Sequence, residues 1–226
     1  MSARALWIKI CGNTSLADAR LAVEAGADAV GFVFAPSPRR VTAPEAASII
    51  SHLLPMVEKI GVFVDAGLEE IYSTVRIGGL TGVQLHFDAG ADLPAKLHER
   101  LGPQLRILRV VHFDPGAAEL VSKQVAEHAK NLHVDGVLVD SHTAAAVGGT
   151  GVVFDWSQAR KTIFADIGTL KLIAAGGLNP ANVAEAIATL RPWGVDVVSG
   201  VEAEPGRKDH LKVREFVAKA RAVSHE

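Results

Sequence analysis

Cys11 is the only cysteine among the 226 residues, and it closes the segment WIKIC. Because side chains two apart on a strand share a face, Lys9 and Cys11 would point to the same side. A nearby cation favours the thiolate, the form in which a cysteine acts as a nucleophile or a base. A lone cysteine in such a segment is more often a small buried hydrophobe. The pair therefore indicates a candidate for proton-transfer chemistry, with a structural cysteine as the alternative.

Polar side chains also end other apolar segments. Gln84 and His86 share a face in GVQLHF, Asp140 ends GVLVD, and Asp196 lies within VDVVSG. Histidine and carboxylate groups are common general acids and bases. The alternatives are that Gln84 and His86 form a satisfied buried pair and that Asp140 caps the following turn. The nine histidines show no ligand-like spacing with cysteine or paired carboxylates, so we expect no metal site.

Two glycine sites predict an anion-binding region. Gly176-Gly177 and Ser199-Gly200 each end an apolar segment. Glycine lets the backbone approach an anion closely, and backbone N–H groups can then bind a phosphate. Tight turns are the alternative explanation. Arg39 and Arg40, in the segment APSPRRVT, could receive a carboxylate through a bidentate pair, or could belong to a solvated loop.

The elements that would carry these residues alternate along the chain. Apolar, β-branched segments predict eight strands, at 5–11, 29–35, 59–64, 82–87, 106–113, 136–140, 171–177 and 195–202. Helix-start signals lie between them: Ser15 precedes 16–26, Thr42 and Glu45 form a capping box, and Asn179 precedes Pro180 at a first helical position. The final helix is expected within 209–223.

This alternation is typical of an α/β fold with a parallel sheet. Eight strand–helix units without a Pro-, Gly- or Ser-rich linker predict a (β/α)8 (TIM) barrel, with 1–226 as a single domain. In that fold the active site lies at the carboxyl ends of the strands, where the polar residues gather. A doubly wound sheet is the second possibility, but its first turn should read G-x-G-x-x-G and here reads CGNTS.

Composition excludes several classes of function. Hydrophobic residues make up 49% of the chain, charged residues 21%, and the net charge is −2. These values fit a soluble globular protein. They show no excess of basic residues of the kind that binds nucleic acid. No apolar run approaches the roughly 20 residues that cross a bilayer. The N-terminus has no secretory h-region and a single cysteine forms no internal disulfide, so we expect a cytoplasmic protein.

Taken in order, the motifs resemble the phosphoribosylanthranilate isomerase family of tryptophan biosynthesis. They are KICG with LADARLAVEAGADAVGFVFAPSPRRV, IGVFV, QLH, VDGVLVDS, GGTG-x-x-FDW, AAGGLNPANVAEAI, GVDVVSGVE and PG-x-KD, and they cover nearly the whole chain. Three positions depart from the family pattern: Arg40 stands for a tyrosine, Phe87 for a glycine and Val198 for a serine.

The resemblance implies an Amadori rearrangement of N-(5-phosphoribosyl)anthranilate, with no cofactor and no metal. It implies that Asp140 is the general acid at the ribose ring oxygen and that Cys11 is the general base at C2′. Arg39 would meet the anthranilate carboxylate. The phosphate would bind at Gly176, Gly177, Ser199 and Gly200. We assign the remaining inward polar residues to substrate binding: Lys9, Gln84, His86 and Asp196. The expected partner is this phosphoribosyl compound, with no nucleic acid or membrane, in a monomer or homodimer.

Three other functions fit parts of this pattern. A phosphosugar barrel could catalyse a retro-aldol, epimerase or synthase reaction, and a Schiff-base aldolase among these would use Lys9 as its nucleophile. An isomerase for the analogous histidine-pathway intermediate would bind a second phosphate, whereas one glycine-rich site is visible here. A catalytically silent phosphate-ligand binder would lack the acid or the base, and both are present.

Overall fold

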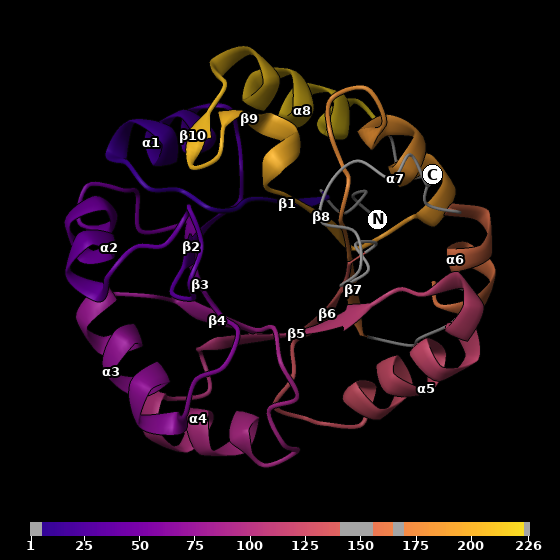
Figure 1. The fold of residues 1–226 in the computed structure, drawn as a ribbon, viewed down its shortest axis with the longest axis horizontal. Helices are drawn as coiled ribbons and strands as arrows, with labels where there is room; N and C mark the ends of the chain where they lie inside the picture. Colours follow the sequence, from indigo (N-terminus) through magenta and orange to yellow (C-terminus); the bar gives the residue numbers. More distant parts are fainter. Residues whose placement is uncertain (1–5, 141–155, 165–169, 224–226) are drawn as a thin grey trace.

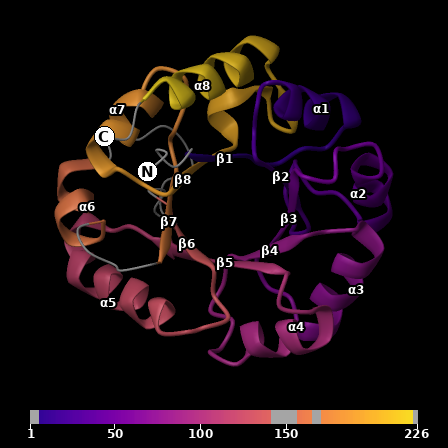
Figure 2. The ribbon, with the colours of Figure 1, turned by 180° about the vertical axis from the view of Figure 1, so that it is seen from behind.

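The computed structural model describes residues 6–140, 156–164 and 170–223. Its strands form a closed parallel barrel in chain order, with β8 pairing back onto β1. Figures 1 and 2 show the helices as an outer ring around the strands. The predicted (β/α)8 barrel is therefore confirmed. The strands are β1 Trp7–Ile10, β2 Ala29–Val33, β3 Glu58–Phe63, β4 Gly82–Leu85, β5 Arg106–His112, β6 Gly136–Asp140, β7 Lys171–Ala175 and β8 Gly194–Val197.

The helices lie close to the predicted positions. They are α1 Leu16–Glu24, α2 Ala43–Ile50, α3 Leu68–Gly78, α4 Leu93–Leu101, α5 Ala118–Ala129, α6 Trp156–Thr162, α7 Val183–Leu190 and α8 His210–Ala222. Two short 3₁₀ helices are present, η1 Pro115–Ala117 and η2 Ser199–Val201, and the hairpin of β9 Glu202–Glu204 and β10 Arg207–Lys208 joins η2 to α8. None of the helices in the described part of the chain is long and apolar enough to span a membrane.

Helix capping follows the prediction at two sites, occurs at a third that was not predicted, and departs from the prediction at one. Ser15 accepts from the Asp18 backbone, Thr42 and Glu45 complete a capping box, and Asp209 caps α8. The prediction that α7 begins at Pro180 is wrong, because α7 begins at Val183. The Asn179 and Asn182 side chains accept hydrogen bonds from nearby backbone N–H groups instead. Such local bonds compete with the helix and hold 179–182 in a turn.

The apolar side chains form two clusters, one between the strands and the helices and one inside the barrel. Ile8 and Ile10 belong to the large core between the strands and the helices. Trp7 belongs to a separate cluster inside the barrel, with Ala29, Ile60, Leu108, Leu138, Ile173 and Ala175. The predicted alternation along β1 is thus confirmed. The inner cluster fills the lower barrel, so polar side chains farther along the strands lie at the carboxyl-terminal mouth.

Candidate active site

Lys9 lies at the centre of a buried polar cluster. Its ammonium donates to Gln84 Oε1 and to Asp196 Oδ1, both at 2.9 Å, and its side chain is fully buried. β1 and β8 place Lys9 and Asp196 directly opposite each other in the parallel ladder. Burial alone would lower the pKa of Lys9, but the Asp196 carboxylate and Cys11 raise it above its ordinary value. Lys9 is therefore a fixed cation beneath the mouth.

Cys11 follows β1 on the same inward side. Its side chain is 3% exposed, and its sulfur fills the space above Gly31 of β2: a Cβ at position 31 would lie 2.4 Å from Sγ. Only glycine at position 31 leaves room for this thiol. Burial raises the pKa of the Cys11 thiol, while Lys9 and Lys208 act in the opposite direction. The expected effect of Lys9 is present, but burial outweighs it, so the resting group is the neutral thiol.

A direct prediction concerns this titration. Because burial favours the uncharged form, the Cys11 thiolate should appear only above about pH 8.5, the ordinary range of a free thiol. The ultraviolet absorbance of the thiolate, taken as the wild type minus Cys11→Ser, measures it directly. The difference should be flat at neutral pH and rise on the alkaline side. A thiolate signal already present at pH 7 would contradict the assignment of a neutral resting thiol.

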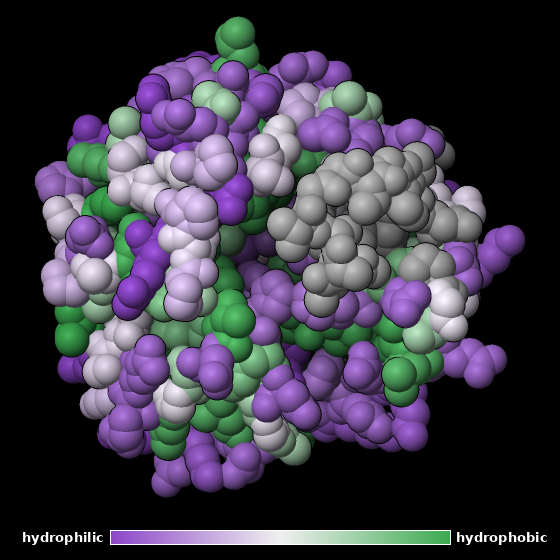
Figure 3. Space-filling model, in the orientation of Figure 1, coloured by the Kyte–Doolittle hydropathy of each residue, from purple (hydrophilic) through white to green (hydrophobic). Residues whose placement is uncertain are grey.

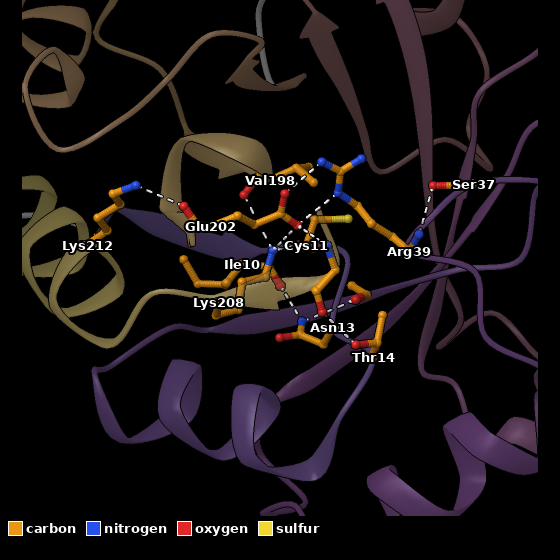
Figure 4. Close-up of polar contacts among 12 residues, drawn as sticks. Ile10, Cys11, Asn13, Thr14, Ser37, Arg39, Val198, Glu202, Lys208 and Lys212 are labelled. Carbon is orange, nitrogen blue, oxygen red and sulfur yellow. Dashed lines mark hydrogen bonds and ion pairs between the residues drawn. The ribbon is translucent and has the colours of Figure 1, made fainter. Parts of the chain in front are cut away.

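Arg39 reaches the mouth from the loop after β2 and is held by a carboxylate of the protein. Its Nε and Nη2 donate to the two oxygens of Glu202 at 2.8 and 2.6 Å. Lys208 donates to the same carboxylate at 3.2 Å and to the Cys11 carbonyl at 2.6 Å. Figure 4 shows Glu202 between the two cations, with the Cys11 side chain beside them. The β9–β10 hairpin therefore fixes both the end of β1 and the guanidinium of Arg39.

This arrangement predicts the effect of Glu202→Gln on stability. The Lys208 side chain is fully buried, so loss of its carboxylate partner leaves an uncompensated buried charge. Breaking such a pair costs about 3–5 kcal/mol. Denaturant unfolding should show a fall of this size in the free energy of unfolding. Glu204→Gln is the matched control: its exposed pair with Arg207 should contribute no more than about 1 kcal/mol. Equal effects of the two substitutions would contradict this account.

Glycine loops form one wall of a cavity of about 340 Å³ at the mouth. The cavity is lined by Arg39, Asp140, 175–178 and 196–200, so all four predicted phosphate residues, Gly176, Gly177, Ser199 and Gly200, lie on it. Gly176 and Gly177 have φ of 81° and 63°, and a Cβ at Gly200 would lie 1.9 Å from the Leu178 carbonyl. These close approaches require glycine. Figure 3 shows a hollow at the centre of this face, with both polar and apolar residues around it.

A second cluster of polar side chains, His86, His112 and Asp140, lies at the carboxyl ends of β4 to β6. His86 follows β4, and its Nε2 lies 3.1 Å from Nε2 of His112 at the end of β5. Asp140 ends β6 beside them, and one ligand atom of each of the three lies within 4.8 Å of the others. Burial and the neighbouring His112 lower the pKa of His86, so its imidazole is neutral at pH 7. His112 was not among the residues singled out from the sequence.

The geometry thus brings all the predicted site residues to one end of the barrel. Cys11 is not among the residues that line the glycine-walled cavity, whereas Arg39 lines it and contacts the space above Gly12, the residue after Cys11. Of the three departures from the family pattern, Val198 lines the cavity, Phe87 packs partly buried against the outer core, and Arg40 is exposed. Part of the GGTG-x-x-FDW motif lies outside the described residues.

Comparison with known proteins decides the family. The family model for N-(5'-phosphoribosyl)anthranilate (PRA) isomerase matches residues 8–219. The chain belongs to this family. N-(5'-phosphoribosyl)anthranilate isomerase of Trichlorobacter lovleyi is 42% identical over 215 residues, covering 95% of this chain and 97% of the relative. The family accounts for the (β/α)8 fold and for the order of the motifs from β1 to α8.

Two solved phosphoribosylanthranilate isomerase structures are similar over almost the whole barrel. One is a complex with reduced 1-(o-carboxyphenylamino)-1-deoxyribulose 5-phosphate, and the other is a monomeric form of the dimeric enzyme from Thermotoga maritima. Each is 36% identical, has a TM-score of 0.78, and covers 95% of this chain and 98% of its own. The predicted isomerase of tryptophan biosynthesis is confirmed by this membership. The aldolase, histidine-pathway and silent-binder alternatives are not favoured.

Proposed function

We propose that this protein converts N-(5'-phosphoribosyl)anthranilate into 1-(o-carboxyphenylamino)-1-deoxyribulose 5-phosphate, with Asp140 as general acid and Cys11 as general base. One observation carries the proposal: Arg39, Asp140 and the two glycine loops line a single cavity at the mouth of the barrel. A ligand of the same class, the reduced product, is bound in the solved family member described above.

The phosphate binds between the loops that follow β7 and β8. The backbone at Gly176, Gly177, Ser199 and Gly200 lines the cavity there, and the absence of side chains on the glycines lets an anion approach the N–H groups. Holding the phosphate at one end fixes the position of the ribose, which converts later proton transfers into intramolecular steps. Asp140 lines the same cavity, so a ribose held there lies beside the residue that we propose as its acid.

Asp140 starts the reaction by giving its proton to the ring oxygen. The C1′–O bond breaks as the anilino nitrogen donates its electron pair, so the furanose opens to a protonated Schiff base. The buried Cys11 thiol first loses its proton to solvent, a loss that the neighbouring Lys9 cation favours. The resulting thiolate then removes the proton from C2′, and the electrons pass to nitrogen to give an enolamine. Protonation at C1′ and loss of the enol proton yield the ketone. Overall one hydrogen moves from C2′ to C1′, and the proton lost from the 2′-hydroxyl replaces the one that Asp140 gave to the ring oxygen; no oxidant, cofactor or metal takes part.

The anthranilate carboxylate binds at Arg39. Glu202 already occupies Nε and Nη2 of this side chain, and no described residue accepts a hydrogen bond from Nη1. Nη1 is therefore the donor offered to the substrate, and Glu202 holds the plane of the guanidinium in place. His86 and the cluster of Lys9, Gln84 and Asp196 complete the floor and the far wall of the site.

Lys9 acts as a cation and not as a nucleophile. A Schiff-base lysine requires a lowered pKa, so that its amine is neutral. Here the ion pair with Asp196 raises the pKa of Lys9. The Lys9–Asp196 ion pair therefore argues against the aldolase hypothesis. The Lys9 charge instead favours the thiolate of Cys11, against the larger effect of burial.

The remaining assignments follow from composition and from the relatives. A net charge of −2 and the absence of a basic footprint support a small-molecule partner and no nucleic acid. We place the enzyme in the cytoplasm, without a membrane partner. It works as a monomer or a homodimer; the dimeric enzyme of Thermotoga maritima is 36% identical to it.

The test of the proposed function is a turnover assay with the purified protein. Phosphoribosylanthranilate is fluorescent, so its consumption is followed as a loss of emission over the spontaneous rate. The assay should show saturable turnover that persists in EDTA and is competitively inhibited by the reduced product analogue. A folded protein, verified by circular dichroism, that leaves the spontaneous rate unchanged would overturn the proposal.

A further inference from the structure

His86, His112 and Asp140 form a cluster that the proposed reaction only partly uses. They come from three neighbouring strands, at the carboxyl ends of β4, β5 and β6. His112 and Asp140 are direct partners in the parallel register of β5 and β6. The His86 backbone N–H donates to the Phe63 carbonyl at 2.8 Å, and that of Phe113 donates to the Asp140 carbonyl at 2.8 Å. The three side chains therefore project from a rigid part of the barrel.

The spacing of the ligand atoms is close to that of a metal site. Two imidazole nitrogens bound to one tetrahedral Zn²⁺, at bond lengths near 2.05 Å, lie about 3.3 Å apart. The two Nε2 atoms here lie 3.1 Å apart. One ligand atom of each of His86, His112 and Asp140 lies within 4.8 Å of the other two, so the three side chains converge on one place. Two histidines and a carboxylate are a common ligand set of open zinc sites.

We propose that His86, His112 and Asp140 bind one divalent transition-metal ion, with Zn²⁺ as the best-fitting ion, and that the bound ion inhibits the isomerase. The metal site rests on geometry alone, while its inhibitory effect rests on the proposed role of Asp140. An ion bound to Asp140 occupies the carboxyl group that the proposed reaction needs beside the ribose ring oxygen. Zn²⁺ is thus an inhibitor of this enzyme and not a cofactor.

When the metal binds, each proton that the three ligands carry has a place to go. In the hydrogen-bonded pair one imidazole carries its proton on Nε2 and the other presents a lone pair there. A metal needs both lone pairs, so the first ring shifts its proton to Nδ1, and no proton leaves the histidines. A protonated Asp140 releases its proton to solvent. The fourth position of a tetrahedral ion then takes a water from the open mouth.

A second histidine pair provides the control. His98 Nδ1 and His133 Nδ1 lie 3.0 Å apart beyond the other end of β5, and His98 Nε2 is bonded to the Leu105 carbonyl at 2.9 Å. Among the described residues, no third metal-ligating side chain joins this pair. It has the same nitrogen spacing but lacks the carboxylate. His133→Ala therefore tests whether two close histidines suffice.

Binding is measured first, without reference to catalysis. Protein stripped with EDTA is titrated with ZnCl₂ by calorimetry and with CoCl₂ by visible absorption. The wild type should bind one ion with the intense visible bands of four-coordinate Co²⁺. His112→Ala should bind at least about tenfold more weakly, because even the loss of a residue that only supports a ligand costs about 10–100-fold in metal affinity. His133→Ala should match the wild type. Equal binding by the wild type and His112→Ala would overturn the site, as would a sulfur-to-cobalt charge-transfer band, which would place the metal on Cys11.

Inhibition is measured second, as the ratio of turnover with and without ZnCl₂ for each variant. The wild type and His133→Ala should lose turnover at the Zn²⁺ concentrations at which they bind it, and EDTA should restore it. His112→Ala should resist those concentrations. Full activity of the zinc-loaded wild type would overturn the inhibitory role. A protein without isomerase activity that still binds Co²⁺ through His112 would refute the proposed function and leave the metal site standing.

Discussion

Replacing Asp140 with asparagine should lower kcat at least about 100-fold. General acid catalysis by a positioned side chain contributes about 10²–10⁴-fold, and a carboxamide has no comparable proton to give to the ring oxygen. The change is nearly isosteric, and the Asp140 carbonyl keeps its bond from the Phe113 N–H. The barrel and the glycine loops should therefore be unaffected, and the Kd of the reduced product analogue should change little.

The measurement is the fluorescence assay under saturating substrate. Asp114→Asn is the matched control, because Asp114 is an exposed aspartate near the end of the adjacent strand, and an asparagine can still accept the bond from the Gly116 N–H. This variant should retain wild-type turnover. An Asp140→Asn enzyme with more than about a third of the wild-type kcat would remove Asp140 from the role of acid.

Replacing Cys11 with alanine should also lower kcat at least about 100-fold, because no base remains at C2′. Cys11→Ser should fall by a similar factor, since a hydroxyl ionises far less readily than a thiol. The serine variant keeps nearly the volume of the thiol against Gly31, so it separates lost chemistry from lost packing. Both variants should bind the reduced product analogue as the wild type does. A Cys11→Ala enzyme with wild-type kcat would leave the family assignment intact and exclude this thiol as the base.

Side chains alternate along a strand, so residues two apart share a face, and this alternation accounts for the part of the site that could be predicted. It placed Lys9, Gln84 and Asp196 on the inward face of different strands, and the structure joins them by hydrogen bonds of 2.9 Å. The order of the eight apolar segments predicted the closed barrel, which brings the first and last strands together. Local patterns therefore determined both the fold and the end of the barrel at which the site lies.

The contacts that could not be predicted join side chains that lie far apart in the sequence. Glu202 meets Arg39 across 163 positions of sequence, and His112 meets His86 across 26. Such pairs depend on the barrel register and on the β9–β10 hairpin, which no local spacing reveals. The GVE and PG-x-KD motifs contain Glu202 and Lys208 but gave no indication of their roles. The direction of the Cys11 titration depends on burial, and the need for glycine at position 31 depends on where the sulfur lies.

The central claim is that Asp140 opens the ribose ring and Cys11 then takes the C2′ proton. The most direct test is the primary isotope effect with substrate deuterated at C2′, compared between the two variants. In Cys11→Ala the C–H cleavage becomes rate-limiting, so the account predicts a full isotope effect on turnover. In Asp140→Asn ring opening becomes rate-limiting, so the effect should disappear. An isotope effect expressed in Asp140→Asn and absent from Cys11→Ala would contradict the assignment of the two residues.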